Sequence, residues 1–304
     1  QEAGEVELIF EFMDVKRLYT DAYLQRLAEL YRFKYAGRQI DVIIASDDHA
    51  LDFLLGEGRD LFSGVPVVFC AVNGYDPARH HGNGRALTGV VETIDVRATL
   101  EVGLQLHPDT RKVAVITDRT LTGRALKADA QEIFQDFEDR VQFTYLEHLT
   151  MEKLQRQAAA LSDDTIVFAF IFSQDQYGRV FSHEYNLERL AAHCDVPIYS
   201  VWEFYLGHGI VGGMLTSGQA HGEVAARMAL RILRGEDAAD IPVVLDSPNR
   251  YMFDQEQMAR FGVQASRLPA GSVVINASLS FYEEHKGVIL GSGALIIVLL
   301  VAVA

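Results

Sequence analysis

Cysteine and positive charge are both scarce in this sequence, and each shortage narrows the range of functions. Only two cysteines, Cys70 and Cys194, occur in 304 residues, and no CxxC or other zinc-type spacing exists. We expect both to be buried small residues, although a disulfide stays open. The 27 basic residues are outnumbered by 42 acidic ones, for a formal charge of −15, and no basic run exceeds a dipeptide. This balance argues against nucleic acid and anionic membrane surfaces as partners.

Motifs of common catalytic and nucleotide-binding sites are also missing. There is no GxSxG elbow, no P-loop and no HExxH. A GxGxxG pattern at residues 207–212 precedes a strand-like segment, so we interpret its glycines as turn glycines. His80 and His81 have no third ligand at a suitable spacing, and the run SDDH at residues 46–49 is too short to build a triad. We therefore expect no catalytic residue, no metal site and no cofactor.

Apolar strand-like segments alternate with helical segments along most of the chain. IDVIIA, VPVVFCAV, KVAVITD and TIVFAFIF are uniformly apolar, whereas segments such as GRALKADAQEIFQDF have apolar residues at helical spacing. Strands of this kind are buried on both faces, which is typical of a parallel sheet covered by helices. VELIFEFM, residues 6–13, is predicted to be the first strand. The predicted class is α/β, with right-handed crossovers between parallel strands.

The order of these segments predicts two doubly wound parallel-sheet lobes with a ligand cleft between them. Lobe 1 is expected to comprise residues 1–93 plus about 215–248, and lobe 2 residues 94–214 plus about 249–270. A long helix capped by Ser217 is expected to pack back on the first sheet. No low-complexity linker separates the halves, so the chain is expected to cross between them more than once.

The two ends of the sequence carry further predictions. It starts at Gln1 without a methionine or a signal segment, which is typical of a cleaved or trimmed product. Residues 287–304 contain no charged residue and approach the ~20 apolar residues that span a membrane. Soluble core helices rarely stay apolar on every face, so we expect the start of a transmembrane helix, with more protein beyond it. Residues 271–286 would be the juxtamembrane segment; a buried C-terminal helix is the alternative.

Polar and aromatic side chains gather where six of the predicted strands end. In an open parallel sheet, ligands bind beyond the carboxyl ends of the strands. The predicted ligand-binding residues are Phe12, Asp14, Ser46, Asp47, Asp48, His49, Asn73, Tyr75, Asp118, Gln174, Asp175, Trp202 and Glu203. Any one Asp, Asn or Ser is equally well explained as a helix cap, and we expect Ser46 or Asp47 to cap the helix that follows. Their repetition at six strand ends favours a shared cleft.

The chemistry of these side chains suggests the class of ligand. The carboxylates suit amine or hydroxyl groups, and the aromatic side chains suit a ring or an apolar face. Free helix amides stabilise an anionic group by about 0.3–1 kcal/mol, but the neighbouring acids oppose a bare anion. We therefore predict a small amino-acid-like or aromatic solute.

Three stretches of the sequence resemble a known superfamily: IIASDDHALDFLL, VPVVFCAVNGYDP and YLGHGIVGGMLTSGQAHGEVAARMALRILRG. Over nearly its whole length the chain resembles the type I periplasmic-binding-protein superfamily, in the ABC-transporter substrate-binding-like branch. That branch includes binding proteins for aromatic amino acids and extracytoplasmic sensor domains of bacterial membrane receptors. SPNRYMFDQEQMARFGV and LPAGSVVINASLSFYEEH resemble the sensor version.

This resemblance implies a two-lobed clamp without catalysis. Its ligand contacts would come from residues 46–49 and 73–75 of one lobe, with positions like Asp118, Gln174 and Trp202 in the other. Solute-binding members often carry a small hydroxyl residue and alanine in the first of these loops. This chain has SDDHA there, and the two acids count against a simple free-carboxylate ligand.

The resemblance and the apolar C-terminal run together predict a periplasmic sensor domain of an inner-membrane receptor. Closure of the lobes on a ligand would shift the C-terminal helix; the output module, of histidine kinase or cyclic-dinucleotide enzyme type, and a homodimer stay open. The alternative is a solute-binding protein of an ABC transporter. An enzyme lacks a catalytic constellation here, and a DNA-binding regulator would need a helix-turn-helix and a different charge.

Overall fold

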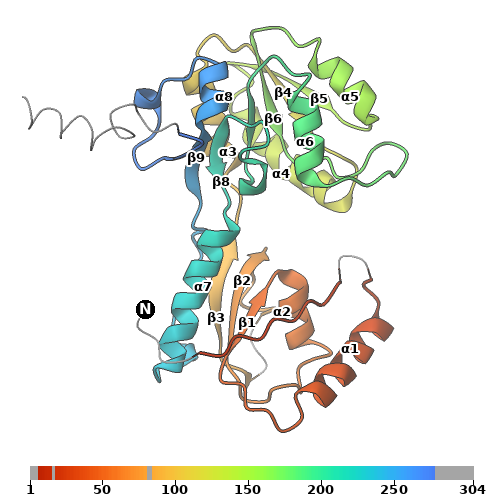
Figure 1. Ribbon diagram of the computed structural model, residues 1–304, viewed down its shortest axis with the longest axis vertical. Coiled ribbons are helices and arrows are strands. Elements are labelled where there is room, and N and C mark those ends of the chain that lie inside the picture. The colour runs from red at the N-terminus through yellow and green to blue at the C-terminus, as the bar shows by residue number, and fades with distance from the viewer. Residues whose placement is uncertain (1–5, 16–17, 81–83, 278–304) are drawn as a thin grey trace, which may run out of the picture. The chain divides into compact units, whose positions relative to one another are not determined.

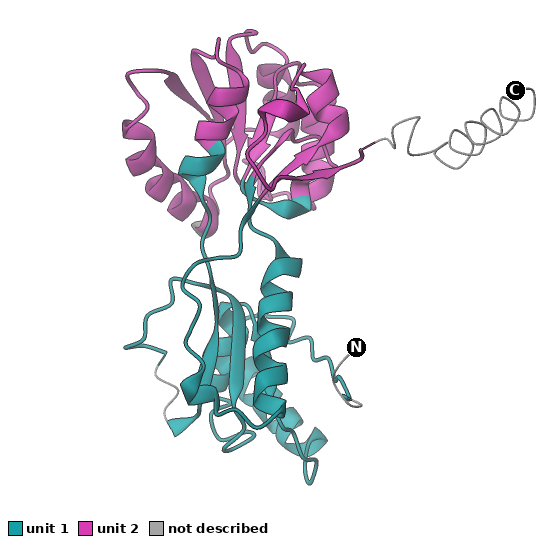
Figure 2. Cartoon of the chain, turned by 90° about the vertical axis from the view of Figure 1, so that its left-hand side faces the viewer, with its two compact units in different colours: residues 1–99, 201–204, 214–250 teal, residues 100–200, 205–213, 251–304 magenta. Residues whose placement is uncertain are grey.

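A computed structural model describes residues 6–15, 18–80 and 84–277 (Figure 1). The chain divides into two compact units (Figure 2). Unit 1 comprises residues 1–99, 201–204 and 214–250, and unit 2 comprises residues 100–200, 205–213 and 251–304. The chain therefore passes between the units more than once.

Unit 1 is built on a parallel sheet with the strand order β1-β2-β3. Its strands and helices are β1 (Ile43–Ser46), β2 (Val67–Asn73), β3 (Leu87–Glu92), α1 (Asp21–Lys34), α2 (Asp48–Leu55), α7 (Gly218–Leu233) and the 3-10 turn η3 (Ala238–Asp240). Helices α1 and α2 cover one face of the sheet, where Leu27, Leu51 and Phe69 share a buried cluster (Figure 1). Helix α7 covers the other face with Ala225 and Met228. The prediction that this late helix packs on the first sheet is confirmed.

Residues 6–13 form no strand, so the prediction of a first strand there is wrong. The side chains of Leu8, Phe10 and Phe12 are 69%, 75% and 89% exposed. The segment runs past the end of α1, where Glu11 accepts hydrogen bonds from Lys34 and Tyr35. Alternation of apolar and polar residues predicts a strand only if a neighbouring strand completes the ladder. Among the described strands of unit 1, none pairs with this segment.

Unit 2 is built on a seven-stranded sheet with the order β10-β9-β8-β7-β6-β4-β5. Its strands are β4 (Lys112–Ile116), β5 (Gln142–Leu146), β6 (Thr165–Ala169), β7 (Ile198–Ser200), β8 (Gly212–Leu215), β9 (Arg250–Asp254) and β10 (Val273–Ile275). The helices are α4 (Leu121–Gln135), α5 (Met151–Ala158), α6 (His183–Ala191) and α8 (Gln255–Arg260), with the 3-10 turns η2 (Glu203–Tyr205) and η4 (Ala265–Arg267). Helix α3 (Val96–Leu106) and some of these elements cross the unit boundary. The predicted α/β class with parallel sheets is confirmed.

A glycine explains how β8 enters the sheet. Gly212 has a positive φ of 150°, and a Cβ atom there would lie 2.2 Å from the carbonyl oxygen of Met252. Only glycine permits this approach of β8 to β9. The GxGxxG pattern, whose last glycine this is, therefore serves the backbone of the sheet.

Side chains cap several of the helices, and the predicted cap residue Ser217 is one of them. The side chains of Asp95, Thr150 and Ser217 accept backbone N–H groups of α3, α5 and α7 at 2.8, 3.2 and 3.1 Å. At α2, Asp47 occupies the cap position with a φ of 81° but its side chain makes no capping hydrogen bond. The prediction that Ser46 or Asp47 caps α2 is thus confirmed for the position of Asp47, although its backbone conformation differs from the extended one that caps normally adopt.

The two cysteines lie in the interiors of the two units, one in each. Cys70 and Cys194 are buried, as predicted, and both are free, which the sequence leaves open. Among the described residues, no helix is both long enough and apolar enough to cross a membrane. The predicted start of a transmembrane helix at residues 287–304 and most of the predicted juxtamembrane segment lie outside the described residues.

Candidate functional site

The strand ends of unit 1 bring several predicted residues to one edge of its sheet. Strand β1 ends at Ser46, which is in register with Cys70 of β2, and β2 ends at Asn73, which is in register with Glu92 of β3. Because the strands are parallel, the loops that follow them lie on the same side. The carboxylate of Asp48 accepts hydrogen bonds from the backbone N–H of Asn73 at 2.8 Å and from its amide Nδ2 at 3.2 Å. The loops after β1 and β2 are therefore joined.

Glu92 is a residue of this edge that the sequence analysis missed. Burial raises the pKa of its carboxyl group; nearby His221 opposes this, whereas Asp47 and Asp48 add to it. A hydrogen bond with the Asn73 side chain also lowers the pKa, but burial dominates. The sequence carries a signal for it, since Glu92 directly follows the apolar pair Val90 and Val91.

His221 supports the same edge from helix α7. Its ring is buried, with Nδ1 2.9 Å from the carbonyl oxygen of Ser217 and Nε2 3.2 Å from that of Val91. Nε2 also lies 3.2 Å from the hydroxyl of Ser247. The imidazole thus ties α7 to β3 beside Glu92 and is positioned by backbone groups on two sides.

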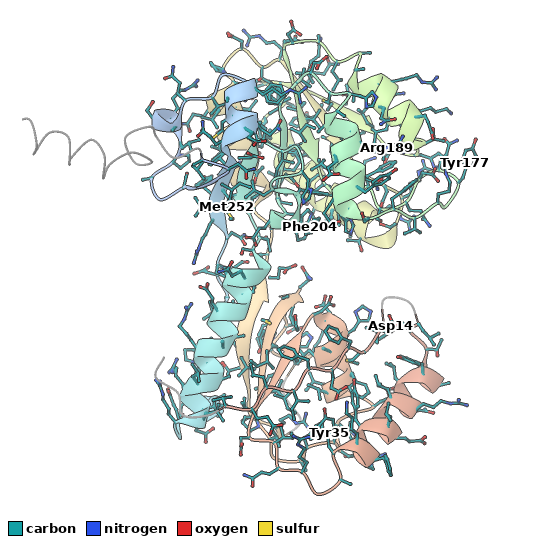
Figure 3. All side chains as sticks on the ribbon, in the orientation of Figure 1. Asp14, Tyr35, Tyr177, Arg189, Phe204 and Met252 are labelled. Atoms are coloured by element: carbon teal, nitrogen blue, oxygen red, sulfur yellow. The ribbon has the colours of Figure 1, made fainter. Side chains whose placement is uncertain are left out.

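The remaining predicted residues of unit 1 have varied surroundings. His49 lies 3.4 Å from the carboxylate of Asp47, and its ring meets that of Tyr19 edge-on at 4.5 Å. Tyr75 stacks on Phe69 with the ring centres 4.9 Å apart, so much of its surface belongs to the core. Phe12 and Asp14 precede α1, in a part of the chain that lies outside the sheet. Figure 3 labels Asp14 there. Phe12 and Asp14 are therefore not strand-end residues.

In unit 2, Asp118 is the centre of a network at the matching edge of the sheet. Strands β4, β6 and β7 end in register at Ile116, Ala169 and Ser200. The Asp118 carboxylate is buried just beyond β4 and accepts hydrogen bonds from Thr120 and from the loop after β6. The carboxylate is thus engaged within the protein.

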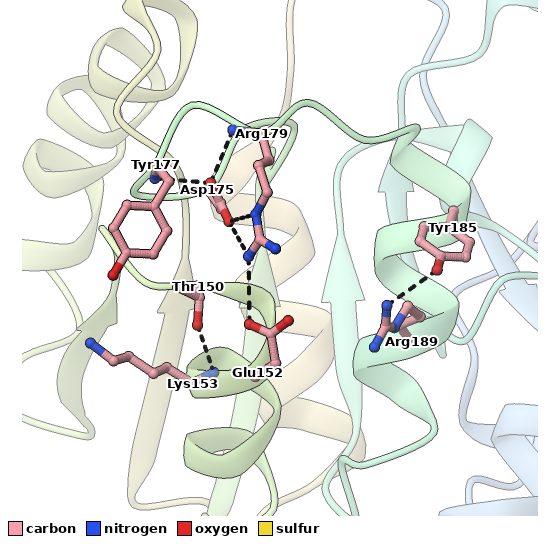
Figure 4. A network of polar contacts seen from close by, with 8 residues as sticks. All are labelled: Thr150, Glu152, Lys153, Asp175, Tyr177, Arg179, Tyr185 and Arg189. Atoms are coloured by element: carbon pink, nitrogen blue, oxygen red, sulfur yellow. Dashed lines mark hydrogen bonds and ion pairs between the residues drawn. The ribbon is translucent and has the colours of Figure 1, made fainter.

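The loop after β6 is held by a second carboxylate (Figure 4). The Asp175 side chain is fully buried and accepts from Nε of Arg179 at 2.7 Å and from the backbone N–H groups of Tyr177 and Arg179 at 2.9 and 3.0 Å. Burial opposes ionisation, but these hydrogen bonds outweigh it and lower the pKa of Asp175. Gln174, next to it, bridges to Val180 across the loop. Asp175 therefore shapes the loop, and the exposed Gln174 lies on it.

Trp202 and Glu203 follow β7 and belong to unit 1 by their contacts. The indole of Trp202 stacks on the ring of Phe204, with the planes 14° apart. Its Nε1 is buried and has no hydrogen-bond partner among the described residues. Glu203 donates its backbone N–H to the carbonyl of Thr216 at 3.1 Å. A buried donor without an acceptor in the protein is rare, so this N–H is a candidate for a contact with a solute or a water molecule.

A separate cavity of about 580 Å³ lies in unit 2. It is formed by α4, the turn after it and β5, and it is lined by Arg111, Gln131, Phe134, Gln135, Glu138, Asp139, Arg140, Val141, Gln142, Phe143 and Tyr145. None of the predicted ligand-binding residues lines it. Within residues 6–15, 18–80 and 84–277, no cluster of three or more His, Cys, Asp or Glu side chains could hold a metal ion.

Comparison with known proteins identifies the fold. No model of a protein family and no curated protein matches the chain. A ligand-free, open substrate-binding protein with adhesive properties from Clostridium difficile matches with a TM-score of 0.60 at 14% identity, over 84% of each chain. An ABC domain from Streptococcus pneumonia in complex with L-Trp matches with a TM-score of 0.53 at 13% identity, over 86% of this chain and 91% of that one. The chain has the fold of the type I periplasmic binding proteins.

A third structure with this fold is a conserved domain protein from Vibrio cholerae, with a TM-score of 0.52 at 15% identity over 82% of this chain and 83% of that chain. Ligands of such folds bind at the carboxyl ends of parallel strands. In this binding-protein fold, the strand ends of both units carry the polar groups described above. We therefore take the strand ends of each unit, and not the cavity beside β5, as the places of the candidate binding residues.

Proposed function

We propose that the chain is a non-catalytic, extracytoplasmic sensor domain of a membrane signalling receptor, which binds a small amino-acid-like or aromatic solute by closure of its two units. The observation that carries the proposal is the gathering of polar side chains at the carboxyl edges of two parallel sheets in a binding-protein fold. Binding is inferred from those side chains, since the fold alone hosts many functions.

Fewer of the predicted residues are proposed as direct contacts to the solute, because several are hydrogen-bonded within the protein. Three predicted acids have their oxygens engaged within the protein: Asp48 with Asn73, Asp118 with the loops after β4 and β6, and Asp175 with Arg179. The proposal therefore gives them a supporting role. Direct contacts come from the groups beside them, with Glu92 and Trp202 as the main candidates.

The proposed contacts favour an amino acid with an aromatic side chain. A carboxylate at Glu92 suits an ammonium group, the indole face of Trp202 suits a ring, and the indole N–H suits a carboxylate oxygen. One structure with the same fold contains L-Trp, which supports L-tryptophan as the first probe.

The receptor and transporter alternatives differ in how the domain is attached. The uncharged, apolar sequence of residues 287–304 supports a membrane attachment at the C-terminal side, as in a receptor. In cells, a reporter fused after Ala304 should then lie in the cytoplasm. A reporter in the periplasm, or release of the fusion by osmotic shock, would favour the ABC-transporter alternative.

Binding itself is tested with the full 304-residue chain in mild detergent. Because Trp202 is the only tryptophan, intrinsic fluorescence reports directly on the candidate site. Titration with L-phenylalanine or L-tyrosine should change the emission of Trp202, and calorimetry should detect L-tryptophan. Arg140→Ala, which alters the cavity beside β5, is the matched control and should bind normally. If none of the twenty L-amino acids changes the fluorescence or the melting temperature, the amino-acid proposal fails.

A further inference from the structure

Asp118 joins two neighbouring loops of unit 2 through one buried carboxylate, which is 2% exposed. Its Oδ1 accepts from the backbone N–H of Thr120 at 3.0 Å and from the Thr120 hydroxyl at 2.5 Å. Its Oδ2 accepts from the backbone N–H and the hydroxyl of Ser173, both at 2.8 Å, and from the N–H of Gln174 at 3.3 Å. Five donors converge on a group with about four acceptor positions, so it has no capacity left for a ligand.

The turn after Asp118 is shaped around this carboxylate. Thr120 is the N-cap of α4 and its hydroxyl accepts the N–H of Gly123 at 3.0 Å. A Cβ atom on Gly123 would lie 2.4 Å from Oδ1 of Asp118 and 2.6 Å from its carbonyl oxygen. Glycine is therefore required for the cap and the carboxylate to lie this close.

The second loop is fixed at both of its ends. Ser173 is held by Asp118 and also accepts the N–H of Phe181 at 3.0 Å. Two residues further on, the Asp175 carboxylate closes the turn through Arg179 (Figure 4). The exposed Gln174 lies between these two anchors and pairs with Val180. Its backbone direction is consequently set by two buried carboxylates.

We propose that Asp118 is a positioning residue, which fixes Ser173 and Gln174 for contact with the solute without touching the solute itself. The proposal rests on the proposed binding function. It reassigns Asp118 from a ligand contact, as the sequence predicts, to the support of one. Without the carboxylate, three backbone N–H groups in the two loops would have to find new acceptors, and the loop after β6 would sample several conformations.

The decisive variant is Asp118→Asn, because it keeps the shape and replaces one acceptor oxygen by a donor. The amide nitrogen must then face either Thr120 or the N–H groups of Ser173 and Gln174. Hydrogen exchange followed by mass spectrometry on the ligand-free chain should show at least about tenfold faster exchange in peptides covering residues 172–176. The affinity for L-tryptophan should fall by at least about tenfold.

Thr165→Val provides the matched control for stability. Thr165 is buried at the amino end of β6, the strand that leads to Ser173, but lies at the opposite end from the site. It should lower the melting temperature while leaving L-tryptophan affinity unchanged. Equal loss of affinity in both variants would mean that Asp118 acts only through overall stability, and would overturn the proposal.

The exchange measurement separates this proposal from the proposed function. Unchanged exchange in Asp118→Asn overturns the positioning role, whatever the chain binds. Faster exchange in the variant, together with a wild-type chain that ignores L-tryptophan, upholds the control of the loop and counts against the ligand. If the variant does not fold, hydrogen exchange of the wild-type chain tests the proposal instead. Rapid exchange of its Ser173 and Gln174 amides in the absence of solute would overturn the proposal.

Discussion

Trp202 has the most unusual polar environment among the candidate residues. An indole N–H can only donate, and leaving a buried donor unpaired costs about 1–3 kcal/mol. Trp202→Phe removes the N–H and keeps an aromatic ring. We expect the melting temperature of the ligand-free chain to stay equal or rise, while L-tryptophan affinity falls by about 3- to 10-fold. Calorimetry on both proteins checks this, and a fall in melting temperature without any loss of affinity would contradict it.

The raised pKa of Glu92 predicts that the stability of the fold depends on pH. Burial raises the folded pKa of Glu92 above the ordinary value of 4.5, so the folded state binds the proton more tightly than the unfolded state. Stability therefore falls as the pH rises from about 4.5 through the folded pKa, and the penalty persists above it. Glu92→Gln should raise the melting temperature at pH 8 and remove this part of the pH dependence. The exposed Glu101→Gln is the control, and parallel curves for wild type and Glu92→Gln between pH 4 and 8 would refute the assignment.

Residues 6–13 are an exposed apolar segment of unit 1. Leu8, Phe10 and Phe12 face solvent beside a sheet whose outer strand β1 is itself half covered. Exposed apolar segments of high strand propensity promote association. Phe10→Lys combined with Phe12→Lys should reduce dye binding by the native chain and its aggregation, with little change in melting temperature. The same change at the fully buried Phe69 should abolish folding; a large loss of stability in the double variant would show that residues 6–13 pack against the fold.

The elements that the sequence predicts well are those whose pattern is set by burial alone. The apolar strands β2, β4 and β6 and the helix α7 were foreseen because both faces of a covered parallel sheet demand apolar residues. Residues 6–13 are predicted as a strand and form none, whereas β10 is a strand inside the predicted juxtamembrane segment. In both cases strand pairing depends on a partner elsewhere in the chain, which the local pattern does not reveal. The role of Asp118 was equally invisible, since five donors from two loops meet it only after folding.

For the whole molecule, the proposed binding produces a signal only if it shifts the equilibrium between open and closed states. A ligand shifts an open–closed equilibrium only by its difference in affinity for the two states, and a shift from about 1% to 99% closed needs about 5.5 kcal/mol. Because Glu92 and Trp202 both belong to unit 1, this difference would have to come from contacts that unit 2 adds, such as those proposed for Ser173 and Gln174. A variant of Glu92 or Trp202 that lowers the affinity for the solute should therefore also lower the closed fraction at a given solute concentration.

Small-angle X-ray scattering of the full chain tests closure directly. Saturating L-tryptophan should lower the radius of gyration of the wild type, because hinge closure brings two compact units together around the solute. Trp202→Ala, compared at the same free ligand concentration, should show a smaller decrease, and Arg140→Ala should match the wild type. Scattering curves that superimpose with and without ligand, under conditions where calorimetry records saturation, would leave binding in place and remove closure as the means of signalling.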